Sequence, residues 1–478
     1  MRPRTLLILL AIVLVLGAFI WFYERTLPSS EERVELGKKV FRLEKDDVTA
    51  VSIDSGKGSV RLERVLLAKR EKPRFEKGAP PPASSEWRMV RPLATRADAF
   101  AVDRLLEALA SLDKSRTLEG ADPKAVGLDK PRATLRLTTK KGETVLKLGA
   151  EVPPGGNLVA GVGGRKETYV VADTILTDAD RDPLDWRDRQ MVHGDREDVE
   201  RITLTGAAGG PVVLVRQPQG FRIEKPIADR ADRELTEGLL ADLTGLMAER
   251  FVPPGKTAAD LGLSPPRETV EVAFKGKPPL RIDLGSPVTG TAAPEGQTTG
   301  ELTYARIGDA LFEARTRLAE AARRAPAAWQ AVQLSAFEVY QIESATVKDA
   351  QATLQLTREG TDWKRGGTVI SFLPVSDLWS VLTSAKATRL LSPAEAQGLR
   401  AGASPPLVTF ILHTKEGDET LTLYPEQKEG APARASGRDA VLLLSADTLH
   451  QIQAKLQDVK TAKPVTPVKA EKGKKTGT

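Results

Sequence analysis

The acidic run DADRDPLD, which begins at Asp178, is the strongest candidate in the sequence for metal chemistry. Asp178, Asp180 and Asp182 match the first three ligand positions of an EF-hand calcium loop. The match then fails twice, because Pro183 stands where the loop needs glycine and Arg189 stands where it needs a bidentate glutamate. We therefore expect a solvated turn here and no metal site.

Other catalytic and nucleotide-binding motifs are incomplete. PGKT at 254–257 ends like a phosphate loop but has Arg250 in place of its first glycine, and GVGGR at 161–165 lacks a third glycine, so both predict loops. The chain has no cysteine and no Gly-x-Ser-x-Gly elbow. The histidines, which share no motif, are His193, His413 and His450. The sequence thus predicts no catalytic residue, metal ligand or cofactor, and no enzyme.

Two tryptophans and three arginines remain as candidate interaction residues. Trp186 and Trp329 occur in similar segments, DPLDWRDRQMV and APAAWQAVQLSAF, and we favour packing between repeated units over ligand stacking because aromatic side chains supply large buried areas. Arg116, Arg250 and Arg389 each follow a leucine-striped segment. The favoured explanation is that each arginine interacts with the partial negative charge at the carboxyl end of the preceding helix. The alternative is an anion-binding site that is repeated in each unit.

The segments that must position these residues occur three times in the sequence. EWRMVRPLATRADAFAVDRLLEALASL at 86–112 recurs as GFRIEKPIADRADRELTEGLLADLTGL at 220–246, and a shorter third copy starts at Trp363. Each copy predicts an amphipathic helix with one apolar stripe, and Asp98 and Asp232 stand at the N-cap positions of the first two. Each helix is followed by two segments of period-two alternation, which predict a hairpin.

We therefore predict an α+β fold: a single N-terminal transmembrane helix followed by three tandem α+β repeat units of about 140 residues, with antiparallel hairpins and short helices. One such short helix is expected after a strand in each unit, with Asp173, Asp309 and Asp447 as its caps. The expected organisation is: stub 1–4, membrane anchor 5–23, linker 24–39, units 40–192, 193–337 and 338–458 (the last degenerate and capping), and tail 459–478.

The amino-terminal segment 5–23 carries no charge and is long enough to span a bilayer as a helix. Arg2 and Arg4 precede it, so the positive-inside tendency places the bulk of the chain on the extracytoplasmic or periplasmic side of the cytoplasmic membrane. A cleaved signal peptide is the alternative, but no small-x-small cleavage site follows.

The net charge of +6 is concentrated in the tail, where six lysines face one glutamate. This Lys-rich segment has little to bury and is expected to be disordered. Because the rest of the chain is nearly neutral and has no basic stripe with interleaved aromatics, nucleic acid is excluded as a partner.

The repeated Trp-Arg and Lys/Arg-Pro motif before the striped helix, the Gly-Leu-x-x-Pro turn and the Trp-Arg-Asp-Arg joint resemble the bacterial domain of unknown function 4340 family. The resemblance covers residues 33–458. It implies an auxiliary component of a gliding-motility-type ABC transporter, and it supplies no catalytic residues.

These observations lead to one expected function and one alternative. We expect a membrane-anchored extracytoplasmic interaction protein, an accessory subunit of an ABC-type transport or motility complex that contacts the permease, a companion subunit or an envelope polymer. The alternative is an envelope polysaccharide or cell-wall processing enzyme. An enzyme would gather residues that break the repeat in one cleft, whereas here they are scattered through Pro/Gly loops.

Overall fold

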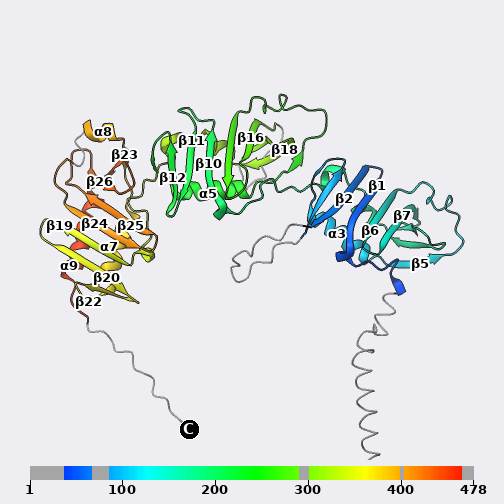
Figure 1. The fold of residues 1–478 in the computed structure, drawn as a ribbon, viewed down its shortest axis with the longest axis horizontal. Coiled ribbons are helices and arrows are strands. Elements are labelled where there is room, and N and C mark those ends of the chain that lie inside the picture. The colour runs from blue at the N-terminus through cyan, green and yellow to red at the C-terminus, as the bar shows by residue number, and fades with distance from the viewer. Residues whose placement is uncertain (1–36, 67–84, 290–300, 399–402, 466–478) are drawn as a thin grey trace, which may run out of the picture. The chain divides into compact units, whose positions relative to one another are not determined.

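The computed structural model describes residues 37–66, 85–289, 301–398 and 403–465. Its strands form three nine-stranded sheets with one shared order, drawn blue to cyan, green, and yellow to orange in Figure 1. The chain divides into two compact units, of which the first ends at Arg189 and the second begins at Gln190. The first sheet lies in the first unit, and the second and third sheets lie in the second unit.

The first repeat has the sheet order β4-β3-β2-β1-β6-β7-β8-β9-β5. Its elements are η2 (Lys45–Asp47), β1 (Val48–Ser55), β2 (Gly58–Leu66), β3 (Ser85–Arg91), β4 (Thr95–Arg96), α3 (Ala99–Ala110), β5 (Lys114–Leu118), β6 (Ala133–Thr139), β7 (Gly142–Val152), β8 (Asn157–Val162), β9 (Thr168–Ala172), α4 (Thr174–Ala179) and η3 (Pro183–Trp186). Neighbouring strands are antiparallel throughout, so β1 and β6 join two meanders at the centre of the sheet.

The second repeat has the order β13-β12-β11-β10-β15-β16-β17-β18-β14. Its elements are η4 (Arg196–Asp198), β10 (Val199–Thr205), β11 (Val212–Gln217), β12 (Gly220–Lys225), β13 (Asp229–Arg230), α5 (Arg233–Thr244), β14 (Arg250–Phe251), β15 (Glu268–Phe274), β16 (Leu280–Pro287), β17 (Glu301–Ile307), β18 (Ala310–Thr316), α6 (Leu318–Arg323) and η5 (Pro326–Trp329).

The third repeat has the order β22-β21-β20-β19-β24-β25-β26-β27-β23. Its elements are η6 (Val339–Gln341), β19 (Ser344–Asp349), β20 (Thr353–Glu359), β21 (Asp362–Arg365), β22 (Thr368–Ile370), α7 (Phe372–Ser384), β23 (Arg389–Leu391), α8 (Pro393–Gly398), β24 (Val408–Thr414), β25 (Gly417–Leu423), β26 (Ala431–Ala435), β27 (Val441–Leu444) and α9 (Ala446–Thr461). Residues 466–478 of the expected tail lie outside the described residues.

Each core forms where a striped helix meets the buried face of its sheet. In α3 the buried side chains recur at helical spacing and join strand residues in one apolar cluster: Ala101, Val102, Leu105, Leu106 and Leu109. The same stripe is buried in α5 and α7. Asp98 and Asp232 cap their helices as expected, because their carboxylates accept from the backbone N–H groups of Ala101 (3.1 Å) and Leu235 (3.0 Å).

The predicted α+β fold class was wrong, because each repeat is dominated by one antiparallel sheet and the helices are few and mostly short. The short helix expected to begin at Asp309 shows how the error arose. There Gly308 has a positive φ of 56° and closes a tight turn from β17 into β18, so the apolar residues after Asp309 continue the sheet.

The single transmembrane helix of that fold class is corrected as well. Among the residues that the structure describes, no helix is both long enough and apolar enough to cross a membrane. Segment 5–23, on which that prediction depended, lies outside the described residues.

Candidate functional site

Trp186 is fully buried in the first repeat, at the end of η3. Its backbone carbonyl accepts a hydrogen bond from the N–H of Asp98 (2.9 Å), the residue that caps α3. The guanidinium of Arg181 lies 5.4 Å from the ring centroid. Trp186 therefore holds the amino end of the striped helix to the joint segment that follows α4.

Trp329 has the same arrangement in the second repeat. Its carbonyl accepts from the N–H of Asp232 (2.7 Å), and Arg324 lies 5.3 Å from its ring centroid. The indole N–H groups of both tryptophans have no acceptor among the described residues, a cost that the large apolar contact of each ring must offset. Because both rings are buried in their own repeats, neither offers a face on which a ligand could stack.

The three repeated arginines lie on exposed edge strands, one per sheet: Arg116 on β5, Arg250 on β14 and Arg389 on β23. Arg250 lies 4.0 Å from a carboxylate oxygen of Glu313, and Arg389 pairs with Glu395 (2.9 Å) and Glu429 (3.2 Å). Exposed pairs of this kind contribute little to stability. The pairs of Arg250 and Arg389 link the edge strands β14 and β23 to neighbouring side chains.

The acidic run that resembles a calcium loop is used for local contacts. Asp178 pairs with Arg104 (3.0 Å) and Arg181 (3.4 Å), and Asp182 accepts from the N–H of Leu184 (2.9 Å) at the start of η3. In the described ranges, no group of three or more His, Cys, Asp or Glu residues is arranged to hold a metal ion.

A buried charge network, which no sequence motif indicated, joins the second and third repeats within the second compact unit. The Asp229 carboxylate, on β13, is fully buried and binds the Arg438 guanidinium through two bonds, Nε to Oδ1 (2.8 Å) and Nη2 to Oδ2 (2.9 Å). Arg438 also donates to the carbonyls of Ala331 (2.6 Å) and Gln333 (3.1 Å). One arginine of the third repeat therefore holds both the β13 strand and the joint segment of the second.

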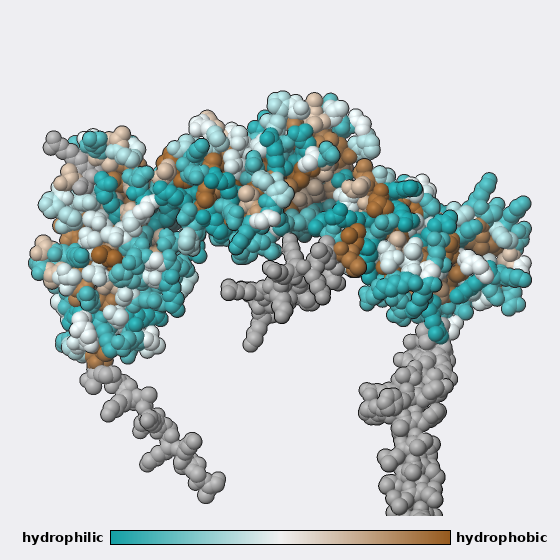
Figure 2. Space-filling model, in the orientation of Figure 1, coloured by the Kyte–Doolittle hydropathy of each residue, from teal (hydrophilic) through white to brown (hydrophobic). Residues whose placement is uncertain are grey.

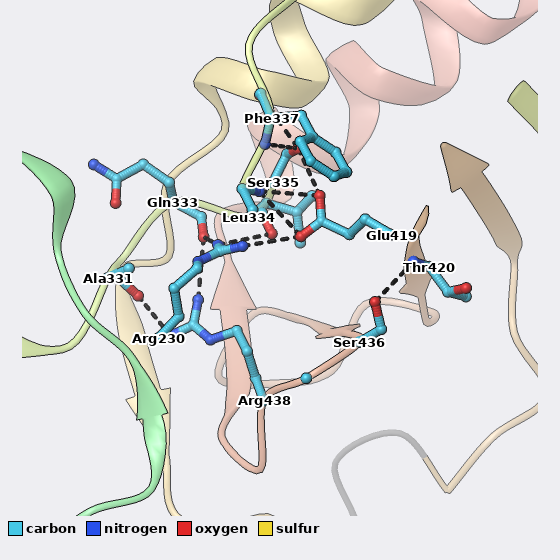
Figure 3. A network of polar contacts seen from close by, with 12 residues as sticks. Arg230, Ala331, Gln333, Leu334, Ser335, Phe337, Glu419, Thr420, Ser436 and Arg438 are labelled. Carbon is cyan, nitrogen blue, oxygen red and sulfur yellow. Dashed lines mark hydrogen bonds and ion pairs between the residues drawn. The ribbon is translucent and has the colours of Figure 1, made fainter. Parts of the chain in front are cut away.

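A second arginine extends this network in the opposite direction (Figure 3). Arg230, next to Asp229, donates to the Glu419 carboxylate of β25 (2.9 Å) and to the carbonyl of Leu334 (3.2 Å). Glu419 in turn accepts from the backbone N–H of Ala336 and from the Ser335 hydroxyl (2.7 Å). Burial lowers the pKa of Arg230, and the neighbouring Glu419 carboxylate opposes this shift, so the cation is kept by its partners.

Every charge in this network has a partner, so the network adds little net stability, but loss of one partner would leave a buried charge and cost much more. Aligning the repeats would not reveal this network, because the first repeat has Thr95 and Arg96, on β4, at the positions of Asp229 and Arg230. The ion pairs depend on how the repeats meet, which is a tertiary property.

Exposed apolar side chains recur at equivalent places in the repeats. Leu93, in the β3–β4 turn, and Ile227, in the β12–β13 turn, are both exposed beside a proline. The second residue of the striped helix is exposed in two repeats, Phe100 in α3 at 87% and Leu373 in α7 at 66%. Figure 2 shows brown hydrophobic patches on a mostly hydrophilic surface. Contiguous exposed apolar patches on proteins commonly are interaction sites.

Comparison with protein families identifies the repeated pattern. The model of the family described as domain of unknown function (DUF4340) matches residues 87–266 and again residues 222–407. The two matches start at equivalent points of β3 and β12, so they are offset by one repeat. No curated protein and no solved structure matches the chain.

Proposed function

Since this chain belongs to the DUF4340 family, we propose that it is a protein-interaction subunit of an ABC-type transport or motility complex on the extracytoplasmic side of the cytoplasmic membrane. The place at the membrane is proposed from the uncharged sequence of residues 5–23. The partner is the permease or its companion membrane subunit, and the repeats supply the binding surfaces.

The observation that carries this proposal is the exposed apolar surface at the amino end of α3. Phe100 and Leu93 lie on either side of β4, one in the first turn of the helix and the other in the turn before the strand. A phenylalanine that is exposed on its helix has no role in the core of its own repeat, whereas aromatic anchors dominate the affinity of protein interfaces.

The test is affinity purification of the full chain from membranes, with identification of the proteins that accompany it. Replacing Phe100 and Leu93 together (Phe100→Ser with Leu93→Ser) is expected to lower recovery of the transporter subunit at least about tenfold, because interface anchors of this size contribute on the order of 2 kcal/mol or more. The melting temperature should stay unchanged, since both side chains are exposed.

Lys147→Ser is the control, because Lys147 is polar and exposed on β7, on the sheet face opposite to its buried neighbours Leu146 and Leu148. It should leave recovery of the subunit unchanged. If wild-type chain recovers no subunit of an ABC-type complex, or if the purified chain cleaves a wall polymer or a sugar, the proposal is wrong and the enzyme alternative takes its place.

A further inference from the structure

A basic pocket of about 550 Å³ opens on the first repeat. Its charged lining consists of Lys39, Arg42, Lys114 and Arg165 against the single carboxylate of Glu143. Lys39 already pairs with Asp113 (3.1 Å) and Glu143 lies 3.8 Å from Arg136. In the part of the chain that the structure describes, Arg42, Lys114 and Arg165 form no ion pair with a carboxylate.

The pocket has a structural counterpart in the third repeat. Gly163 donates its N–H to the carbonyl of Val145, and Ser436 donates to Thr420 in the same way, both at 2.8 Å. The next residue in each turn is a glycine with positive φ, 79° at Gly164 and 72° at Gly437. Arg165 and Arg438 follow these glycines, so they occupy equivalent positions.

The third repeat shows what an arginine at this position binds. Arg438 binds the carboxylate of Asp229, which lies on the short strand β13 of the second repeat, next to a turn. The guanidinium forms a two-point contact with the carboxylate, a geometry that favours planar anions. In the third repeat, an arginine at this position thus binds a carboxylate of the neighbouring repeat.

The first repeat keeps the arginine and loses the acidic residue beside it. Glu419, which pairs with Arg230 beside this site in the third repeat, corresponds to Thr144, because each precedes the residue whose carbonyl accepts the matched hydrogen bond. The Arg165 side chain is held by the carbonyl of Val40 (2.7 Å) and the hydroxyl of Tyr169 (3.4 Å). Lys114 lies 5.4 Å from the centroid of the same Tyr169 ring, so two cations converge on it.

The additional cations are not required by the fold. The backbone bridges Lys39–Asp113, Gln190–Met247 and Gln333–Lys386 align the three repeats at this place. In that alignment the position of Arg42 is His193 in the second repeat and Ala336 in the third. The position of Lys114 is alanine in both, at Ala248 and Ala387. Arg42 and Lys114 thus have no lysine or arginine counterpart in the other two repeats.

We propose that this pocket of the first repeat binds an acidic segment of a partner protein, with Arg165 contacting a carboxylate as Arg438 contacts Asp229, and with Arg42 and Lys114 adding positive charge. The inference rests on the proposed function, since it names the chemistry of the partner. The contact is solvent-accessible and ionic, so it should weaken as salt rises.

The test is binding of a hexa-aspartate peptide to the full chain at low ionic strength, measured by calorimetry. Arg42→Gln with Lys114→Gln is expected to weaken binding about tenfold, and Arg165→Gln by at least as much. The matched control is Lys130→Gln with Lys147→Gln, which removes the same charge from exposed positions outside the pocket. The control should bind the peptide like the wild type, and both double variants should keep the wild-type melting temperature.

Three outcomes would overturn the inference. The first is no binding of the peptide by the wild type, and the second is equal weakening in the control. The third is tighter binding of inorganic phosphate or of phosphatidylglycerol vesicles than of the peptide, which would assign the pocket to a phosphate group. None of these affects the recovery of the transporter subunit through Phe100, so failure of the pocket can be told from failure of the proposed function.

Discussion

Replacing Arg438 with methionine is expected to lower the free energy of unfolding of the second compact unit by about 3–5 kcal/mol. The change leaves the fully buried carboxylate of Asp229 with only the Gln330 amide (2.8 Å) and the Arg230 N–H (2.8 Å) as partners. A buried charge without its counter-ion costs far more than the net contribution of the intact pair. Denaturant unfolding, followed by tryptophan fluorescence, measures the loss.

The control is Arg434→Met, which removes the same side chain from an exposed position on β26. It should change the free energy of unfolding by less than about 0.5 kcal/mol. The double variant Asp229→Asn with Arg438→Met should recover part of the loss, because it removes the stranded charge as well. Equal losses for Arg438→Met and Arg434→Met would contradict the role of the network.

Leu239→Asp is expected to unfold the second repeat. Leu239 is buried on the apolar stripe of α5, and an unpaired carboxylate there costs several kcal/mol, which is comparable with the whole stability of a domain. Loss of near-ultraviolet circular dichroism and rapid proteolysis within residues 193–337 would report the unfolding.

Glu237→Asp on the same helix provides the comparison, since Glu237 is exposed and its charge is kept. It should be nearly silent. If both variants lost the same stability, the assignment of the buried face of α5 would be wrong.

Local signals in the sequence predicted the striped helices and their aspartate caps correctly. Leu105 and Leu239 are buried where the helical spacing placed them, and Asp98 and Asp232 accept backbone hydrogen bonds at the helix starts. These features depend on residues a few positions apart, and a single sequence records such spacings directly.

The share of sheet was underestimated because several strands lack clean alternation. In β5 every residue is at least partly exposed, and β9 is buried at four successive positions, so neither has period two. The third striped helix, α7, differs from the first two in its cap, because the Ser371 side chain at the N-cap position forms no cap hydrogen bond. The pairing of Asp229 with Arg438 was beyond prediction, because it joins residues of two repeats through the way their surfaces meet.

Site-specific photo-crosslinking in cells tests the central claim most directly, with a benzophenone amino acid introduced at position 100 and, in a separate chain, at position 147. Position 100 lies on the proposed interaction surface, whereas position 147 is exposed on β7, on the sheet face opposite to its buried neighbours Leu146 and Leu148. A covalent adduct with the permease or companion subunit of an ABC-type complex at position 100, and none at position 147, is the result that we predict. Equal adducts at both positions, or no adduct with such a subunit at position 100, would contradict the assignment of this protein as an interaction subunit.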